Sequence, residues 1–389
     1  MEQERTQPGT PGGGSALVTP AQVGAELPVA LGIANVGFYV ASIGVVLVVL
    51  AGDLGIAPER LSWLGSAFGY GLIVMAVAGP FALRAGERLV LTVSAVMLGV
   101  GSLLVVIAPG ELALYSGAML QGLGAAGMVL VAPGLLHGPD AAIRLTRVNA
   151  VASVVAVSAP ILLGLAATVG LGARVPLLLI PVSMVVLIVV TRRLPAGRPD
   201  AAARAKGRSS ASWPQTLRRW LALVCSVSVE FAFVVWGVAR LTAAGLDPGL
   251  AAVVGASFQV GMALGRVAGP RLITRLPMVL VGSLVAAGGS LLVVLASVWP
   301  LVGLGELLAG FGVATLYPLT LAALMATPGL RPELGASLGA LASGTAITLA
   351  PAALAGLALV MDLRVAFLVP LPILTALLLL HYERRRPRA

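Results

Sequence analysis

Cysteine and histidine are almost absent from this chain of 389 residues, which holds one cysteine, Cys225, and two histidines. A single cysteine excludes an internal disulfide and any cysteine-rich metal or cluster site. The histidines, His137 and His381, lie in opposite halves of the sequence. No phosphate loop, zinc motif or nucleophile elbow is present either. We therefore expect no metal, no cofactor and no enzymatic activity.

Charge is also scarce, because charged residues make up 10% of the chain, against about 25% in a typical soluble domain. Hydrophobic residues reach 59%, and the mean hydropathy is +1.03. So few polar groups cannot cover a soluble surface, which predicts a polytopic membrane protein. The net charge of +10 lacks the basic stripe with interleaved aromatics of a nucleic-acid surface, so we expect no nucleic-acid partner.

Long apolar runs separated by short turns fill most of the chain. Each run has roughly 18 to 28 residues, and about 20 suffice to span a bilayer as a helix. The runs lie near 27–50, 61–83, 89–108, 111–136, 146–170, 174–191, 219–240, 248–272, 277–298, 300–326, 333–360 and 363–381. The sequence therefore predicts an all-α protein with twelve transmembrane helices in two six-helix bundles.

Polar segments divide the chain into parts. Eight of the 25 basic residues lie between Arg192 and Arg219, with Asp200 as the only acid there. Such a stretch is typical of a flexible cytoplasmic linker. We expect a disordered tail at 1–25, a six-helix bundle at 26–191, the linker at 192–218, a second bundle at 219–382 and a basic tail at 383–389.

The distribution of basic residues predicts the orientation. With the N-terminus inside and the spans alternating, 21 Lys and Arg residues fall on the inner side and four on the outer side. Because basic loops stay on the cytoplasmic side, both termini are expected there. The strong preference for arginine over lysine fits a high-GC bacterial genome. We expect a multi-pass protein of the bacterial cytoplasmic membrane that acts as a monomer.

Short sequences recur at a nearly constant offset. Ser102-Leu-Leu-Val-Val106 returns as Ser290-Leu-Leu-Val-Val294, and Leu120-Gln-Gly-Leu-Gly124 returns as Leu308-Ala-Gly-Phe-Gly312. Ala159-Pro160 and Arg174-Val175 also have counterparts, at Ala350-Pro351 and Arg364-Val365. With six spans in each copy, both copies face the same way across the membrane. Parallel repeats of this kind are typical of transporters that rock around a site near the midplane.

At this point the chain resembles the major facilitator superfamily over about residues 27–381. The turn between the second and third spans reads Gly79-Pro-Phe-Ala-Leu83-Arg84-Ala-Gly86-Glu-Arg88. It is similar to the cytoplasmic gating motif of that family, in which an acid stands at the position of Leu83. The second half has Gly265 and Arg266 at the equivalent turn. The resemblance implies alternating access to a central cavity.

Other motifs of the family are incomplete. The stretch Gln121-Gly-Leu-Gly-Ala125 resembles one in which an arginine lies three residues before the glutamine, and here that position is Ala118. The antiporter motif of the fifth span is degraded around Ala159-Pro160. These departures argue against a multidrug exporter. Glu230 with Trp236, and Tyr317-Pro318 in the tenth span, look more like the solute-permease branches.

Two acids lie inside predicted spans, where a charge costs on the order of 2.5–3.5 kcal/mol. Glu230 lies about midway between Arg219 and Arg240, which places it near the midplane. Glu306 lies only six residues into its span. We expect Glu230, and secondarily Glu306, to carry proton coupling. The alternatives are a buried carboxyl bonded to a neighbouring helix for Glu230, and a shallow side chain that reaches the headgroups for Glu306.

Polar and aromatic residues on several predicted helices could line a substrate cavity. The candidates are Asn35, Tyr39, Gln121, Trp236, Gln259 and Tyr317. Each could instead form hydrogen bonds between helices. The small-residue ladder Gly261, Gly265 and Gly269 predicts close helix packing, with Arg266 at a cytoplasmic helix end.

Taken together, these features predict a secondary active transporter of a small organic solute that works by alternating access and is coupled to protons. Its partners would be the solute, protons and the lipid bilayer. An efflux antiporter for a drug or metabolite stays open as an alternative within the same superfamily. A membrane sensor without transport is a remote alternative, since 192–218 is too short for an output domain.

Overall fold

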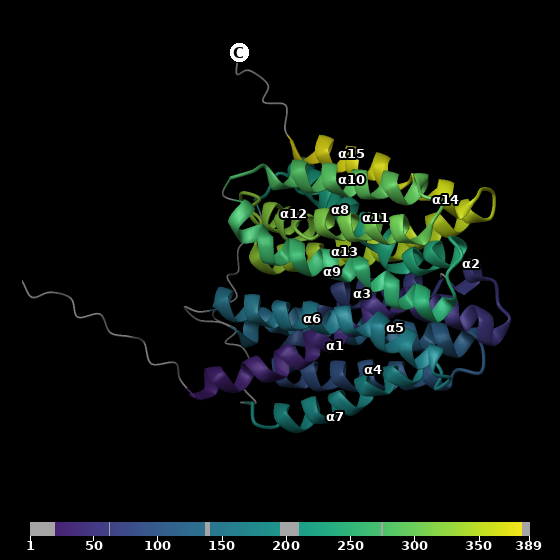
Figure 1. The fold of residues 1–389 in the computed structure, drawn as a ribbon. Helices are drawn as coiled ribbons and strands as arrows, with labels where there is room; N and C mark the ends of the chain where they lie inside the picture. The colour runs from purple at the N-terminus through teal and green to yellow at the C-terminus, as the bar shows by residue number, and fades with distance from the viewer. Residues whose placement is uncertain (1–19, 62, 137–140, 195–209, 274, 383–389) are drawn as a thin grey trace, which may run out of the picture.

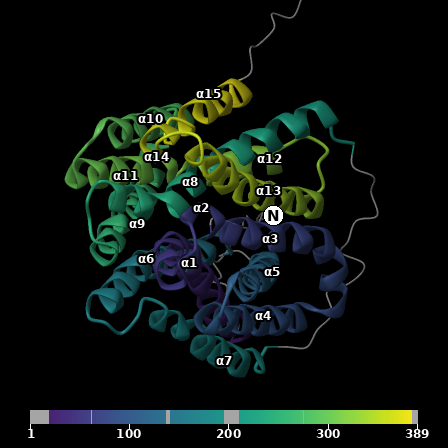
Figure 2. The ribbon, with the colours of Figure 1, turned by 90° about the vertical axis from the view of Figure 1, so that its right-hand side faces the viewer.

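The computed structural model describes residues 20–61, 63–136, 141–194, 210–273 and 275–382. Every regular element in these ranges is helical. Figure 1 shows two layers of roughly parallel helices, with the first half of the chain below the second. We call the end where α1 begins and α15 ends the tail end. The opposite end, which carries α2 and α14, is the far end (Figure 2).

The first half runs through α1 (Pro20–Leu54), α2 (Pro58–Leu61), α3 (Trp63–Ala82), η1 (Leu83–Ala85), α4 (Glu87–Ile107), α5 (Glu111–Leu135), α6 (Ala141–Thr168), η2 (Val175–Leu178) and α7 (Leu179–Thr191). The second half runs through α8 (Trp213–Ala243), α9 (Pro248–Leu272), α10 (Met278–Leu295), α11 (Trp299–Val313), α12 (Leu316–Met325), α13 (Pro332–Ala358), α14 (Leu363–Ala366) and α15 (Pro370–His381).

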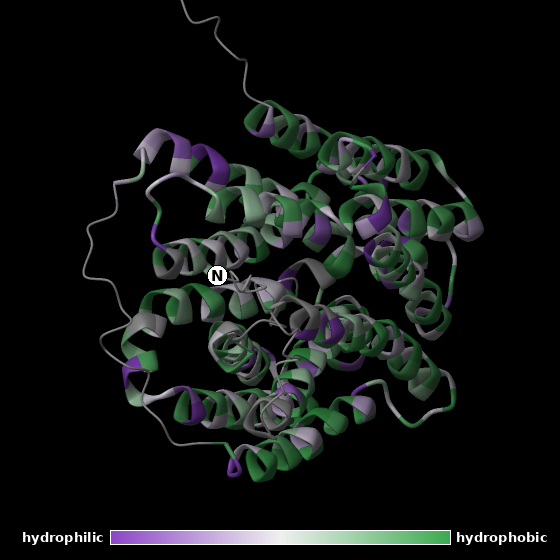
Figure 3. Ribbon diagram, turned by 90° about the vertical axis from the view of Figure 1, so that its left-hand side faces the viewer, coloured by the Kyte–Doolittle hydropathy of each residue, from purple (hydrophilic) through white to green (hydrophobic). Residues whose placement is uncertain are grey.

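The predicted spans are present. Ten helical segments of the described chain are long and apolar enough to cross a membrane. Two shorter apolar helices, Trp63–Gly79 and Val175–Thr191, occupy the predicted second and sixth spans. Large apolar side chains are exposed on the outward faces of the helices, among them Val154, Val267 and Leu379. Figure 3, seen from the tail end, shows that hydrophobic residues predominate along the helices. Lipid is the solvent that such a surface requires.

Three boundaries differ from those expected from hydropathy. Helix α1 begins at Pro20, inside the segment 1–25 assigned to a tail, and α8 begins at Trp213, inside the assigned linker 192–218. Hydropathy marks only the apolar part of a helix and misses its polar first turns. The predicted span 300–326 is divided into α11 and α12, because Pro318 has no N–H for the Ala314 carbonyl.

The two halves repeat the same close helix packing. The Cβ of an alanine at Gly101 would lie 2.6 Å from the Gly117 carbonyl oxygen, and one at Gly289 would lie 2.6 Å from that of Gly305. Both pairs are offset by the same interval in sequence. Glycines thus let the helix backbones touch, α4 against α5 in one half and α10 against α11 in the other.

The recurring arginines have the same structural role in both halves. Arg174 Nη1 donates to the carbonyl of Ala108, just after α4, at 3.2 Å. Arg364 donates to the carbonyls of Val294 and Leu295 at the end of α10. A cation at a helix C-terminus satisfies carbonyls that lack helical partners and complements the helix dipole. This agreement supports the internal repeat independently of the glycines.

Gly122→Val is expected to destabilise the protein by about 1–3 kcal/mol or more, since a Cβ at Gly122 would lie 2.0 Å from the Phe68 carbonyl oxygen. The matched control is Gly288→Val, because a Cβ at Gly288 meets no atom within 4 Å. Thermal unfolding of the detergent-purified variants measures the difference. Equal melting temperatures for the two variants would contradict this account of the packing.

The halves meet along three helix pairs, α3 with α13, α6 with α9, and α1 with α8. Ser66 Oγ donates to the Thr348 carbonyl at 2.8 Å across the first pair. In the third pair, Gly44 brings the backbones together, because a Cβ there would lie 2.4 Å from the Val234 carbonyl oxygen. Toward the far end, a Cβ at Gly164 of α6 would lie 2.6 Å from the Gly249 carbonyl oxygen of α9. The far-end halves of these helix pairs are therefore in contact.

Candidate transport site

A polar cluster lies where the halves meet. Arg266 of α9 donates from Nη1 to Ser153 Oγ of α6 at 2.9 Å, so a side chain of the second half bonds one of the first. Glu230 of α8 lies within electrostatic range of Arg266. Glu230 is half-buried and Arg266 is exposed, while Ser153 is buried. Arg266 lies within the last two turns of α9, which ends at Leu272, and the structure adds that its guanidinium group contacts the other half.

The break between α11 and α12 adds a third element to this cluster. Tyr317 lies in the first turn of α12, and its hydroxyl group is near Ser343 of α13. Tyr317 is also within electrostatic range of both Glu230 and Arg266. One helix turn further along α12, Thr320 Oγ1 lies 3.0 Å from Ser226 Oγ of α8. The broken helix thus places hydroxyl groups beside a carboxyl and a guanidinium group.

This arrangement has the groups needed to bind both an ion and a polar solute. A carboxyl group can gain or lose a proton, and loss of hydration favours its neutral form. A guanidinium group stays charged and carries five donors, of which the bond to Ser153 uses one. A change of charge at Glu230 would alter its attraction for Arg266. Because Arg266 bonds the other half, that change would also act on the contact between halves.

In the first half, Tyr39 and Gln121 are brought to the same depth. Helices α1 and α5 run antiparallel, and Gly32 lies opposite Met128. Tyr39 lies seven residues after Gly32 on α1, and Gln121 lies seven residues before Met128 on α5, so the two residues lie at the same level. Both residues are 0% exposed, and the Tyr39 hydroxyl and both amide atoms of Gln121 have no hydrogen-bond partner within the described part of the chain. Such groups require a polar partner, such as water or a solute.

The remaining cavity candidates have different surroundings. Asn35 is engaged inside the first half, since its Nδ2 donates to the Leu31 carbonyl and its Oδ1 accepts from Ser183 of α7. Trp236 is 1% exposed, and its Nε1 donates to the Pro351 carbonyl of α13 at 3.2 Å. Both side chains therefore join helices within one half. Gln259 is half-buried, two turns before Arg266 on the same face of α9.

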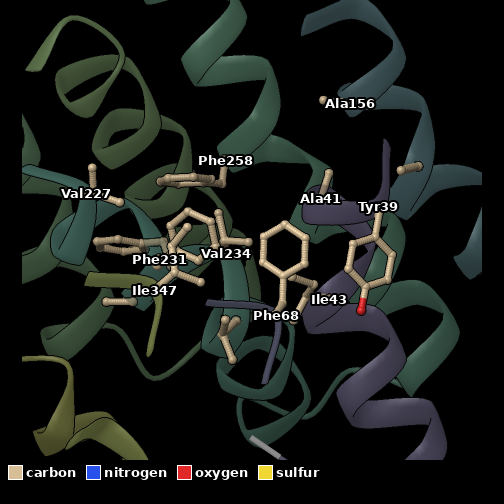
Figure 4. Packing of buried hydrophobic residues seen from close by; sticks show 14 of the residues in the cluster. Tyr39, Ala41, Ile43, Phe68, Ala156, Val227, Phe231, Val234, Phe258 and Ile347 are labelled. Atoms are coloured by element: carbon tan, nitrogen blue, oxygen red, sulfur yellow. The ribbon is translucent and has the colours of Figure 1, made fainter. Parts of the chain in front are cut away.

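Aromatic and aliphatic side chains fill the space between the two halves. The rings of Tyr39 and Phe68 lie 5.4 Å apart, and Phe233 stacks on Phe258 at the same separation. Figure 4 shows Phe68 between Tyr39 and Val234, with Phe258 and Phe231 beyond. Phe68 is 1% exposed. The centre of the interface is therefore apolar, and the polar groups stand beside it.

Glu306 is not a shallow side chain at the membrane surface, as its position in the sequence suggested. It is 1% exposed, and its carboxyl group lies against Gly237 of α8 and accepts from Ser257 of α9 at 3.5 Å. Arg240, which is 3% exposed and donates to the Val293 and Ala296 carbonyls, is within electrostatic range. Counting residues along a helix gives depth, whereas the face of the helix decides whether a side chain meets lipid or protein.

Glu306→Ala is expected to destabilise the protein by about 0.5–3 kcal/mol, because it leaves a void beside Gly237 and Ser257 and removes one of the two carboxyl groups, with that of Asp362, that attract the buried Arg240. Glu306→Gln keeps the volume and the contact with Ser257, so its loss should be smaller. The measurement is thermal unfolding of both purified variants beside the unchanged protein. A Glu306→Ala variant as stable as the unchanged protein would show that the carboxyl group has no structural role.

The residues of the gating motif hold the turn between α3 and α4. Gly86 has φ +102°, a conformation that favours glycine. Gly79 packs against Leu130 of α5, and Arg84 lies over the Phe81 ring at 5.0 Å. Arg88 Nη1 donates to the Leu194 carbonyl just beyond α7. In this conformation the Arg88 hydrogen bond joins the start of α4 to the segment after α7, and both belong to the first half.

The second half has its gating residues on the small-residue ladder of α9. Gly261 and Gly265 lie against the Leu307 and Phe311 carbonyls of α11, and Gly269 lies against Thr315. The prediction of close packing along this ladder is confirmed. Arg266 projects from the same helix to the other half. The close packing along the ladder therefore holds in place the helix from which Arg266 reaches Ser153.

Sequence reasoning did not select Ser153 or Ser343. Serine is common in transmembrane helices, where it usually bonds a carbonyl of its own helix, and both residues do so here with Asn149 and Gly339. Nothing in their local pattern distinguishes them from Ser158 or Ser183. The sequence does carry one signal for Ser153. It lies one helical turn after Asn149 in α6, and therefore closer to the middle of the membrane.

Comparison with known proteins agrees with this architecture. The family model described as Major Facilitator Superfamily matches residues 29–331. A structure of a variant of the nucleoside transporter NupG superimposes with a TM-score of 0.72 at 12% identity, covering 93% of this chain and 99% of that chain. A bacterial homologue of the human lysosomal transporter Spinster, in an inward-facing and unoccupied conformation, gives a TM-score of 0.68 at 14% identity, covering 94% and 95%. No curated protein sequence matches the chain significantly.

The fold and the site between the halves define a multi-pass membrane transporter. The chain belongs to the major facilitator superfamily. At these low identities the superimposed structures show the shared fold alone.

Proposed function

We propose that this protein is a proton-coupled secondary transporter of a small organic solute. The observation that supports the proposal most directly is the cluster of Glu230, Arg266 and Ser153, which joins a titratable group to the contact between halves. Coupling requires that protonation change the relative free energies of two conformations. A carboxyl group beside the arginine that bonds both halves meets this requirement.

The proposed cycle uses these residues in turn. When Glu230 is ionised, it attracts Arg266 and competes with Ser153 for the guanidinium group. When Glu230 takes up a proton, that attraction is lost, and Arg266 is left to Ser153 or to a solute. The proton therefore favours one arrangement of the halves over the other. Glu306, enclosed within the second half, is the secondary candidate for a proton site.

The solute would contact both halves. On one side, Tyr39 and Gln121 offer one hydroxyl group and one amide without partners in the described chain. On the other side, Arg266, Gln259 and Tyr317 offer donors next to the broken helix. We propose a solute with several hydrogen-bonding groups. A screen of compounds by thermal shift of the purified protein, at two pH values, identifies it, because a ligand stabilises the state that it binds.

Transport out of the cell is the second candidate direction. Antiport of a drug or metabolite against protons would use the same carboxyl group. Accumulation in inside-out vesicles would favour it, and accumulation in right-side-out vesicles would favour uptake.

We further propose that the tail end faces the cytoplasm of a bacterial cell, since most basic residues of the described part of the chain lie toward that end. In a Cys225→Ala background, Ser212→Cys should resist an impermeant thiol reagent in intact cells and react after lysis. Ala57→Cys, exposed at the far end, should react in intact cells and serves as the positive control. Labelling of the Ser212→Cys variant in intact cells would reverse the proposed orientation.

A further inference from the structure

A pocket separate from the interface between the halves lies at the tail end of the second half. It has a volume of about 240 Å³, and its lining residues come from α8, α12 and α15. The polar side chains of the lining are those of Gln215, Arg218, Arg219 and His381, together with Thr320, whose hydroxyl group contacts Ser226 of α8. His381 is within electrostatic range of both arginines. Among the described residues that line the pocket, none is Glu or Asp.

The arginine side chains are placed by the helices around them. Arg219 Nη1 donates to the Ala323 carbonyl at 2.6 Å and to Thr327 Oγ1 at 3.2 Å, which ties α8 to α12. The His381 ring lies edge-on to Tyr382, with the centroids 5.1 Å apart. A concave site with several basic groups held in place is suited to an anion with several oxygen atoms, such as a phosphate group.

The surroundings of the pocket indicate where this anion comes from. Trp213, Leu217 and Leu221 form an exposed apolar stripe along α8, with side chains four residues apart. Trp213 is of the type that marks the membrane boundary, and Arg218 lies about 7.5 Å further along the helix. Acyl chains could lie on these side chains while a headgroup enters the pocket.

We propose that this pocket binds the phosphate group of an anionic ligand, with the headgroup of an anionic phospholipid as the source that its surroundings favour. The site involves neither Glu230 nor any residue of the first half. A lipid bound there would connect α8, α12 and α15. Since α8 also carries Glu230 and α12 carries Tyr317, lipid composition would influence the helices that bear the transport site.

The test is thermal unfolding of the purified full chain titrated with dioctanoyl phosphatidylglycerol, dioctanoyl phosphatidylcholine and inorganic phosphate. Phosphatidylglycerol should raise the melting temperature, and phosphatidylcholine should not. In Arg218→Gln and His381→Gln, the concentration for half of the effect should rise about tenfold, as expected for the loss of a charge-assisted hydrogen bond. Arg275→Gln, which removes a charge from an exposed loop at the same end, should behave as the unchanged protein.

Each outcome decides the proposal. Stabilisation by inorganic phosphate that depends on the same two residues would support the anion site and assign it to a soluble ligand. Stabilisation by phosphatidylglycerol alone would support the lipid source. The proposal is wrong if Arg275→Gln weakens the effect as much as Arg218→Gln and His381→Gln do, or if all three variants respond as the unchanged protein does. It is also wrong if none of the three compounds raises the melting temperature.

Discussion

Glu230→Gln is expected to abolish accumulation of the solute driven by a pH gradient. The amide keeps the size and the hydrogen-bonding capacity of the carboxyl group, but it cannot exchange a proton or carry a charge. Its interaction with Arg266 then no longer depends on a proton, so the pH gradient cannot shift the equilibrium between the two conformations through this residue. The measurement is uptake of the labelled solute into proteoliposomes, with and without an imposed gradient.

Solute binding and exchange down a concentration gradient should survive in this variant, which separates a coupling defect from a folding defect. Glu306→Gln makes the same change in the secondary candidate, a buried acid that does not reach the first half, and it should weaken accumulation less than Glu230→Gln does. Full accumulation by Glu230→Gln, together with loss in Glu306→Gln, would move the proton site to Glu306. Full accumulation by both variants would exclude coupling through either acid.

Gly44→Val is expected to stop transport by excluding the conformation described here. A Cβ at position 44 would lie 2.4 Å from the Val234 carbonyl oxygen and 3.1 Å from that of Val235, so α1 and α8 would have to separate. Overpacking costs about 1–3 kcal/mol, and that range shifts a two-state equilibrium by about 5- to 150-fold. The favoured state would be open at the far end.

A single cysteine reports this opening. Val253 of α9 lies against Gly164 of α6 near the far end, and Val253→Cys in a Cys225→Ala background should label slowly in detergent. Adding Gly44→Val should raise the labelling rate. Gly52→Val, on the same helix but with no atom near its Cβ, is the matched control and should leave the rate unchanged. Equal rates in the two valine variants would contradict the proposed role of Gly44.

The architecture could be predicted because helices that cross a membrane must be long and apolar, and such runs are visible in the sequence. Twelve apolar runs and the recurrence of Ser102 and Gly124 as Ser290 and Gly312 were enough to predict two six-helix bundles. The structure adds a physical reason for that recurrence. Gly124 and Gly312 each lie where two helix backbones touch and leave no room for a side chain. The same close helix contact is therefore made by glycine in both halves.

The site was harder to predict, since it depends on which faces of distant helices meet. Glu230 was selected because a carboxyl group deep in a span is costly, and this cost is visible in one sequence. Its environment was not visible. The bond between Arg266 and Ser153 joins residues from different halves, and the enclosure of Glu306 depends on Gly237 and Ser257 of two other helices. The depth of a residue in the membrane can be estimated by counting along its helix. Which face of the helix meets protein and which meets lipid is decided by packing.

The most direct test of the central claim is proton movement on addition of solute to proteoliposomes that start with no pH gradient, followed with a pH-sensitive dye inside them. A coupled transporter must move protons whenever solute moves, so the unchanged protein should shift the internal pH and Glu230→Gln should transport solute without that shift. Solute uptake by the unchanged protein with no change in internal pH would contradict proton coupling through this site.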